Sequence, residues 1–185
     1  MIDATVLARV YGITASKAVA WAPHIQEALR LAECDTKQRV ACWLGQVGHE
    51  SGHLKYTREI WGPTKQQLRY EPGTTLAARL GNVQEGDGAL FMGRGLIQTT
   101  GRANYVMTRQ RMLEFYKDVP DFEAEPHLLQ QQRWAALSAG LYWRVRGLNK
   151  WADSYDFAEL TRRINGGYNG LAERQALYVR ALMVL

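Results

Sequence analysis

The sequence predicts a mainly α-helical protein, and two observations support this fold class. Apolar residues recur at helical spacing along most of the chain, and residues that begin or end helices flank these stretches. Residues 52–101 differ, because they are rich in glycine and show little periodicity. A long irregular stretch within a compact domain is usually functional. We therefore expect a helical base that carries a small irregular or β-containing lobe.

Six helices are expected, over residues 23–33, 36–50, 103–116, 126–146, 157–164 and 171–184. Pro23 and Pro126 suit the first turn of a helix, where the missing backbone donor costs nothing. Asp35 or Thr36 can cap the second of these helices. The last two helices are separated by the glycine-rich sequence NGGYNG, which indicates a turn between them.

Length and composition fit one globular domain over residues 1–185, with 61–90 as a possible inserted lobe or flap. The net charge of +5 and the isoelectric point of about 9.3 favour anionic partners. The basic residues occur in short, scattered clusters and form no long tract. We therefore expect no nucleic acid partner.

The N-terminal sequence MIDATVLARVYGI lacks the basic and apolar regions of a signal peptide. No apolar stretch approaches the ~20 residues that a membrane span needs. Cys34 and Cys42 are too few for a disulfide framework, and they indicate a protein made in a reducing compartment. Whether these two cysteines ever pair is left open by the sequence.

Glu50 is the first candidate for acid chemistry, because it stands at the end of the helix expected over 36–50. Gly52 can end this helix, since glycine tolerates the left-handed conformation that follows many helices. A carboxyl group there faces the negative end of the helix dipole, which favours its protonated form. A general acid that works near neutral pH needs such an environment.

Glu59 follows Glu50 by nine residues. On one continuous helix the two side chains would point in opposite directions and lie ~13.5 Å apart along the axis. Cooperation between them therefore requires the helix to break, which Gly52 allows. An inverting glycosidase places its two carboxyl groups roughly 6.5–9.5 Å apart, with a water molecule beside the base. The alternative is that Glu59 only forms a surface ion pair with Arg58 or another basic residue.

The sequence GRGLIQTTGRANY over residues 93–105 is the second candidate segment. Gln98, Thr100 and Asn104 offer neutral hydrogen-bond donors and acceptors, which suit a sugar or a nucleophilic water. The segment could also be a plain turn before the helix expected over 103–116.

His49-Glu50-Ser51-Gly52-His53 also matches the HExxH pattern of zinc metallopeptidases. That interpretation needs both histidines on one continuous helical face as metal ligands. Gly52 weakens a helix at this point by about 1 kcal/mol relative to alanine. We therefore prefer an ordinary polar role for His53 near a helix end.

Three segments together resemble the catalytic domain of glycoside hydrolase family 19, which includes plant class I chitinases and many phage endolysins. They are QVGHESGHLKYTRE at 46–59, FMGRGLIQTTGRANY at 91–105 and TRRINGGYNGLAERQALY at 161–178. The likeness extends from about residue 36 to the C-terminus and is nearer to the phage and bacterial endolysin branch. It implies a lysozyme-like helical domain with two lobes around a central cleft.

The resemblance also implies roles for particular residues. Glu50 matches the general acid, Glu59 the general base and Thr100 the residue that holds the nucleophilic water. The implied substrate-binding residues are Gln98, Asn104, Tyr105, Asn165 and Arg174. The implied reaction is single-displacement hydrolysis with inversion, without a cofactor or a metal.

Two features depart from the family pattern. Thr99 stands where endolysins of the family often have leucine, and Ile60-Trp61-Gly62-Pro63 replaces the usual asparagine-rich run after the second glutamate. Trp61 could stack on a sugar face or belong to the core. These departures affect the expected sugar subsites more than the expected catalytic pair.

We expect a monomeric endolysin that hydrolyses the β-1,4 bonds between N-acetylmuramic acid and N-acetylglucosamine in peptidoglycan glycan strands. It would remain in the host cytoplasm until the membrane is permeabilised and then act on the cell wall in the periplasm. A chitinase of the same fold and a lytic transglycosylase are the alternatives within this chemistry. A zinc metallopeptidase and a non-catalytic wall-binding module are the alternatives outside it.

Overall fold

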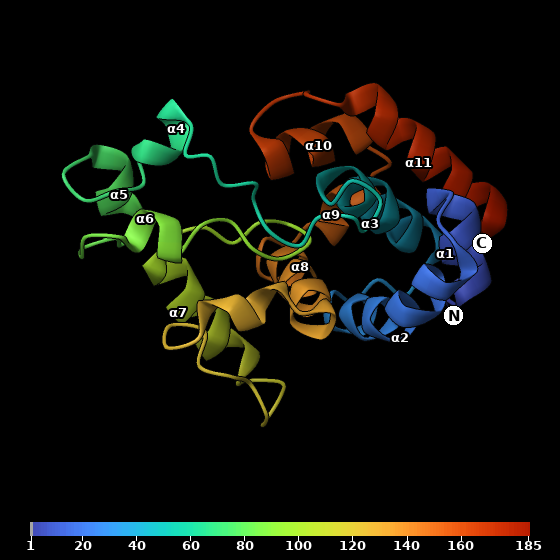
Figure 1. Ribbon diagram of the computed structural model, residues 1–185. Coiled ribbons are helices and arrows are strands. Elements are labelled where there is room, and N and C mark those ends of the chain that lie inside the picture. Colours follow the sequence, from blue (N-terminus) through green and yellow to red (C-terminus); the bar gives the residue numbers. More distant parts are fainter. Residues whose placement is uncertain (1) are drawn as a thin grey trace. The chain divides into compact units, whose positions relative to one another are not determined.

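A computed structural model describes residues 2–185 and confirms the mainly α-helical class (Figure 1). The chain forms two compact units. Unit 1 comprises residues 1–56 and 139–185, and unit 2 comprises residues 57–138. Within the described residues, β-structure is confined to isolated bridges in unit 2. Residues 61–90, the expected flap, fall entirely within unit 2.

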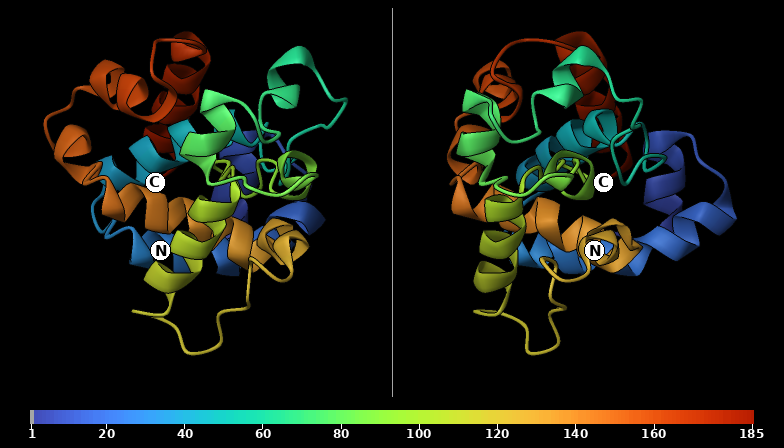
Figure 2. Two further views of the ribbon diagram at one scale, coloured as in Figure 1. Left: turned by 90° about the vertical axis from the view of Figure 1, so that its left-hand side faces the viewer. Right: turned by 60° about the vertical axis from the view of Figure 1, so that its left-hand side comes forward.

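The helices of unit 1 are α1 (Ala4–Tyr11), α2 (Ala15–Leu31), α3 (Lys37–Glu50), α9 (Asn149–Asp153), α10 (Phe157–Asn165) and α11 (Leu171–Val184). Helix α8 (Gln132–Val145) begins in unit 2 and ends in unit 1. Helix α3 is surrounded by its neighbours, with α11 and α9 packed directly against it (Figure 2). Every residue from Ala41 to Gly48 is buried, so α3 forms the core of this unit.

Two glycines of α3 let α11 pack closely against it. A Cβ atom at Gly45 would lie 3.0 Å from the backbone oxygen of Arg174. At Gly48 it would lie 3.1 Å from the Leu177 Cδ1 and would overlap the ring of Tyr11. Glycine inside a helix costs about 1 kcal/mol relative to alanine. The close helix contact explains why α3 carries two of them.

The expected helix over 23–33 is wrong at its start. Helix α2 begins at Ala15, because Thr14 caps it by accepting a hydrogen bond from the Lys17 backbone N–H at 3.4 Å. Pro23 therefore lies inside the helix, where it removes one backbone donor. Burial of Trp21 and Ile25 on either side holds this part of α2 in place.

The helix expected over 126–146 is divided in two. A 3₁₀ helix, η1 (Pro126–Gln130), precedes α8, and Gln131 between them is extended. The remaining expected helices are confirmed to within a few residues at each boundary, including the Thr36 cap of α3, which accepts from Arg39 N–H at 3.2 Å. Cys34 and Cys42 are buried free thiols. Among residues 2–185, no helix combines the length and the apolar character of a membrane span.

Unit 2 contains α4 (Lys65–Leu68), α5 (Thr75–Leu80), α6 (Asp87–Leu90), α7 (Arg102–Met112) and η1. Its core includes two edge-to-face aromatic pairs, Phe91 with Tyr105 and Phe122 with Trp134. Asp87 is buried and forms an ion pair with Arg102 at 2.5 Å. This ion pair ties α6 to the start of α7.

We predict that Gly48→Ala destabilises the protein. The new methyl group would overlap the buried Tyr11 ring, whose hydroxyl donates to the Leu44 carbonyl at 3.0 Å and so cannot swing away. Overpacking of this kind costs about 1–3 kcal/mol, against about 1 kcal/mol gained in helix propensity. Urea unfolding would measure a net loss. Gly167→Ala is the control, since a Cβ there meets no atom within 4 Å, and equal stability of the two variants would contradict the prediction.

Candidate active site

Glu50 is the last residue of α3, and the turn after it has an unusual backbone. Gly52, His53 and Leu54 all have left-handed φ angles, of 56°, 60° and 60°. Buried Ser51 holds this turn, because its hydroxyl donates to the Val47 carbonyl at 2.7 Å and accepts from the Leu54 backbone N–H at 2.9 Å. The expected helix break at Gly52 is therefore confirmed. Left-handed residues other than glycine store strain, and such strain clusters at functional sites.

The zinc interpretation of HExxH is wrong on geometry. Helix α3 ends before His53, so His49 and His53 do not share one helical face. The Nδ1 atom of His53 instead lies 2.9 Å from the Tyr11 carbonyl, and its ring stacks on the Tyr11 ring. Within residues 2–185, no three His, Cys, Asp or Glu side chains are grouped to hold a metal ion.

A buried arginine fixes Glu50. Arg174 is 3% exposed, and its Nη2 donates to Glu50 Oε1 at 2.6 Å. Its Nη1 donates to Gln46 Oε1 at 2.8 Å, and Gln46 in turn donates to the Thr161 hydroxyl at 2.8 Å. The network thus joins α3, α10 and α11 around a single carboxyl group. The Glu50 side chain keeps 26% exposure, so one face stays open to a ligand.

Arg174 changes the electrostatic environment expected for Glu50. The sequence predicts a carboxyl group that faces only the negative end of a helix dipole. The structure adds a full positive charge at 2.6 Å, which offsets that dipole. The same guanidinium acts on His49, whose pKa is lowered mainly by burial and then by Arg174. His49 therefore stays neutral to lower pH than an exposed histidine.

Asn165 and Arg174 meet on the loop between α10 and α11. The Asn165 Nδ2 donates to the carbonyl of Asn169 at 3.0 Å, and the Arg174 Nε donates to the same carbonyl at 3.2 Å. The structure thus brings this predicted pair together. Both hold the loop that follows α10, and Arg174 alone reaches the carboxyl group of Glu50.

Glu59 lies in unit 2 and is held by neutral donors. Its Oε1 accepts from Gln67 Nε2 at 3.0 Å and from the Tyr70 hydroxyl at 3.5 Å. Its Oε2 accepts from the Gly93 backbone N–H at 3.1 Å, while its own N–H donates to the Gly93 carbonyl at 2.7 Å. The alternative of a surface ion pair is wrong, because no basic side chain in the described residues pairs with Glu59. The separation of Glu50 and Glu59, which belong to different units, stays a prediction.

Gln67 links Glu59 to helix α4. It is 3% exposed and belongs to the capping box of this helix with Thr64. Its Oε1 accepts from the Thr64 and Gly62 N–H groups at 2.7 and 3.2 Å, and its Nε2 donates to the Ile60 carbonyl at 2.8 Å besides Glu59. Every hydrogen-bonding site of the amide is used. Its orientation, and with it the position of the Glu59 carboxylate, is therefore fixed.

The start of the GRGLIQTTGRANY segment is paired with Arg58, the residue before Glu59. The backbone of Arg94 forms one isolated antiparallel β-bridge with Arg58 and another with Thr99. Beyond this, Gln98 is exposed and Thr100 is half-buried. Asn104 donates through Nδ2 to the Thr100 carbonyl at 2.7 Å. Three predicted polar residues of this segment are thus placed near its surface in unit 2.

Tyr105 occupies a different position from the rest of the predicted set. It is fully buried, donates to the Met92 carbonyl at 2.5 Å and accepts from Arg94 Nη1 at 2.9 Å. Burial raises its pKa to about 12. This placement differs from the predicted contact with substrate, because a buried ring that bonds the loop backbone supports the loop itself.

Sequence reasoning missed Gln46 and Gln67. Gln46 stands one helical turn before Glu50, on the face of α3 that is otherwise apolar. A polar amide at a position expected to be buried indicates a specific hydrogen-bonding role. Gln67 stands three residues after Thr64, and this T-x-x-Q spacing is typical of a capping box at the start of a helix. Nothing in the sequence ties either glutamine to a particular carboxylate.

Glu50 and Glu59 are each held in a fixed orientation by hydrogen bonds. Most glycoside hydrolases use a pair of such carboxyl groups. No family model matches the chain. A Haemophilus influenzae protein described as "Glycosyl hydrolase family 19 domain-containing protein" is 34% identical over 183 residues, covering 86% of each chain. The protein therefore belongs to glycoside hydrolase family 19.

Solved structures agree on the fold. Chitinase C from Streptomyces griseus HUT6037 matches with a TM-score of 0.71 and 20% identity, over 99% of this chain and 76% of that one. A bacterial family 19 chitinase matches with a TM-score of 0.71 and 19% identity, over 99% and 94% of the two chains. The predicted lysozyme-like helical fold class is confirmed.

We predict that Gln67→Ala lowers kcat about tenfold or more while changing KM less, because it frees the carboxylate of Glu59, the predicted base, from its fixed position. The neighbouring Gln66 is exposed and bonds only Arg69, so Gln66→Ala is the matched control. Steady-state kinetics on a glycan substrate, with melting temperatures for both variants, would test this. An unchanged kcat in Gln67→Ala would show that Glu59 does not depend on Gln67.

We predict that His49 makes the protein less stable in mild acid. Because the folded-state pKa lies below the ordinary value of 6.5, the unfolded chain binds a proton first as pH falls. The stability that neutral His49 contributes to the folded state is fully present above pH 6.5 and is lost as the pH falls toward the folded-state pKa. Urea unfolding at about pH 7.5 and about pH 5 should show a smaller loss for His49→Gln than for the wild type. Exposed His127→Gln should behave like the wild type, and an unchanged pH dependence in His49→Gln would refute the prediction.

Proposed function

We propose that this enzyme hydrolyses the β-1,4 bond between N-acetylmuramic acid and N-acetylglucosamine in peptidoglycan, as an endolysin. In this proposal Glu50 is the general acid, Glu59 the general base, and Thr100 holds the attacking water. The observation that carries it is the Arg174–Glu50 ion pair, which orients a carboxyl group whose other face is open. A general acid must reach the leaving oxygen in one fixed orientation.

The anchoring of Glu59 supports hydrolysis over the lytic transglycosylase alternative. A transglycosylase forms a 1,6-anhydro end and needs no base to activate water. Three donors, from Gln67, Tyr70 and Gly93, hold the Glu59 carboxylate. The general base of a single displacement needs such a fixed position to activate water. Such a displacement inverts the configuration at the anomeric carbon.

Chitin hydrolysis is the second candidate. The similar solved structures are described as chitinases, and chitin, like the peptidoglycan strand, is a chain of β-1,4-linked N-acetylated sugars. The same acid and base would serve either polymer. The net charge of +5 favours peptidoglycan, because its peptide stems carry carboxylates and chitin is neutral.

The proposed setting follows from the proposed substrate. Residues 1–185 would act as one catalytic domain, with 61–90 as a flap, and as a monomer. The enzyme would stay in the host cytoplasm until the membrane is permeabilised and would then reach peptidoglycan in the periplasm. Gln98, Asn104, Asn165 and Arg174 would line or support the sugar subsites.

We expect Glu50→Gln and Glu59→Gln each to lower the hydrolysis of purified peptidoglycan about 100-fold or more, because each removes a proton-transfer group. Turbidity of sacculi would follow the rate, and mass spectrometry would identify the new glycan ends. Chitohexaose is the parallel substrate, and circular dichroism would check that both variants fold.

Different results would point to different alternatives. Full activity in Glu50→Gln would refute its role as the acid. New 1,6-anhydro ends would indicate a transglycosylase, and cleavage of chitohexaose alone would indicate a chitinase. A wild type that binds sacculi without cutting them would indicate a wall-binding module.

A further inference from the structure

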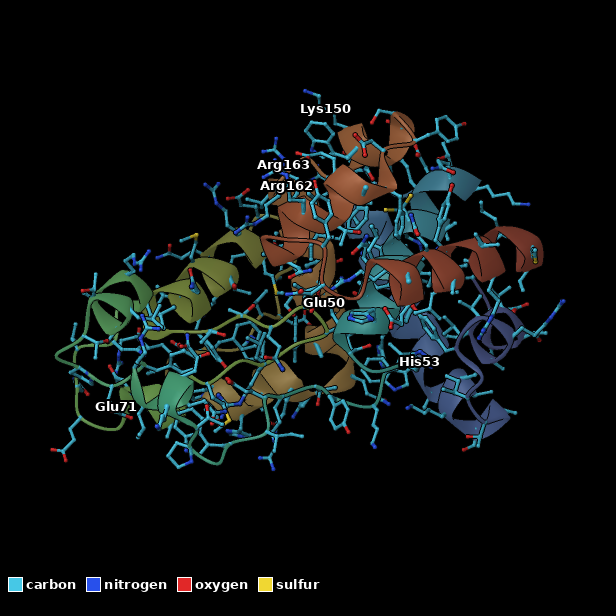
Figure 3. All side chains as sticks on the ribbon, turned by 90° about the horizontal axis from the view of Figure 1, so that it is seen from above. Glu50, His53, Glu71, Lys150, Arg162 and Arg163 are labelled. Carbon is cyan, nitrogen blue, oxygen red and sulfur yellow. The ribbon has the colours of Figure 1, made fainter. Side chains whose placement is uncertain are left out.

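Four exposed cations gather on one surface of unit 1. Arg146 follows α8, Lys150 lies on α9, and Arg162 and Arg163 lie on α10. Figure 3 shows Lys150, Arg162 and Arg163 together over α9 and α10. We call these four residues the basic surface. None of them belongs to the predicted catalytic or substrate-binding set.

Aromatic rings lie among these cations. Lys150 Nζ is 5.1 Å and the Arg163 guanidinium carbon 4.9 Å from the centre of the Trp151 ring. The Arg146 guanidinium carbon is 4.5 Å from the centre of the Tyr142 ring. Cation–π contacts hold long side chains in place without neutralising them. The basic surface is therefore ordered and keeps its charge.

The charge on this surface is only partly balanced. Arg162 and Arg163 share one carboxylate, Glu159, at 2.6 and 2.7 Å. Among residues 2–185, no carboxylate forms an ion pair with Arg146 or Lys150. Two of the four cations thus share one carboxylate, and the other two have no ion-pair partner among residues 2–185. An extended surface of this kind attracts a polyanion more strongly than a single small anion.

The basic surface is connected to Glu50 inside unit 1. The ring of Tyr142 lies under Arg146, and its hydroxyl donates to the Ile164 carbonyl on α10 at 3.3 Å. Burial raises the pKa of Tyr142, Arg146 lowers it, and the Glu50 carboxylate raises it again. The loop after Ile164 is hydrogen-bonded to Arg174, which holds Glu50, so contacts within unit 1 lead from Arg146 to Glu50. A polymer bound at Glu50 would have these cations close by.

We propose that the basic surface binds the acidic peptide stems of peptidoglycan while the glycan strand occupies the site at Glu50. The inference rests on the proposed function and adds a basis for choosing peptidoglycan over chitin. Stem carboxylates recur along the polymer, so one strand can meet several of the cations that lie after α8 and on α9 and α10. Chitin has no such groups and would gain nothing from this surface.

Other polyanions are less suited to the geometry. Nucleic acid or an anionic membrane would satisfy the charge, but neither explains why the surface adjoins the carboxylate of a glycoside hydrolase. These partners become outcomes of the test.

The test measures binding separately from catalysis. The triple variant Arg146→Gln/Lys150→Gln/Arg163→Gln and its control would both be made in the Glu59→Gln protein, which should bind without cutting and keeps the Arg174–Glu50 ion pair of unit 1. The control variant Arg9→Gln/Arg30→Gln/Lys37→Gln removes the same charge from exposed residues of α1, α2 and α3. Binding to purified sacculi, chitin beads, anionic phospholipid vesicles and DNA would be measured at low and high salt.

We expect the triple variant to bind sacculi about tenfold more weakly than the control at low salt, with little difference at high salt, because salt screens exposed charges. Binding to chitin beads should be equal in the two variants. Equal binding to sacculi would overturn the inference, as would equal losses on sacculi and chitin. A loss confined to anionic phospholipid vesicles or to DNA would overturn it in favour of those partners. Failure of the proposed function would appear elsewhere, as absence of peptidoglycan cleavage by the wild-type protein.

Discussion

The unit that carries Glu50 is organised around the buried guanidinium of Arg174. Within a few ångströms it donates to a carboxylate on α3, to an amide on the same helix and to a backbone carbonyl in the loop before α11. A buried cation must be neutralised and fully hydrogen-bonded, because an unpaired buried charge is strongly destabilising. Satisfying Arg174 therefore ties α11 and the loop before it to α3, which is far away in sequence.

That arrangement depends on how closely two helices approach. Arg174 reaches Glu50 only because α11 lies against the glycines of α3, where Gly45 meets the Arg174 backbone and Gly48 meets Tyr11. Side chains at these positions would separate the helices. The glycines lower the intrinsic stability of α3 and gain a fixed carboxyl group at its end. The helix propensity of α3 is therefore lower at the positions where α11 must pack closely to bring Arg174 to Glu50.

The sequence predicted the helical class, the end of α3 and the candidate carboxylates, because these follow from local patterns. It placed α2 wrongly, since Pro23 suggested a start while tertiary burial carried the helix through it. It could not predict the partners of either carboxylate. Arg174 lies 124 residues from Glu50 in the chain, and Gly93 lies 34 residues from Glu59. Such contacts are set by packing, which periodicity does not encode.

The two carboxylates differ in how they are held, and this affects how their variants are interpreted. Glu59 accepts from a neutral amide, a phenol and a backbone N–H, so replacing it by glutamine loses hydrogen bonds but leaves no buried charge. Replacing Glu50 by glutamine leaves Arg174 buried with no counter-charge. Part of any loss at position 50 therefore belongs to the fold of unit 1, whereas a loss at position 59 reports more directly on the chemistry. The ion pair with Arg174 links the proposed acid to the stability of unit 1. The neutral donors around Glu59 make the proposed base largely independent of the stability of its unit.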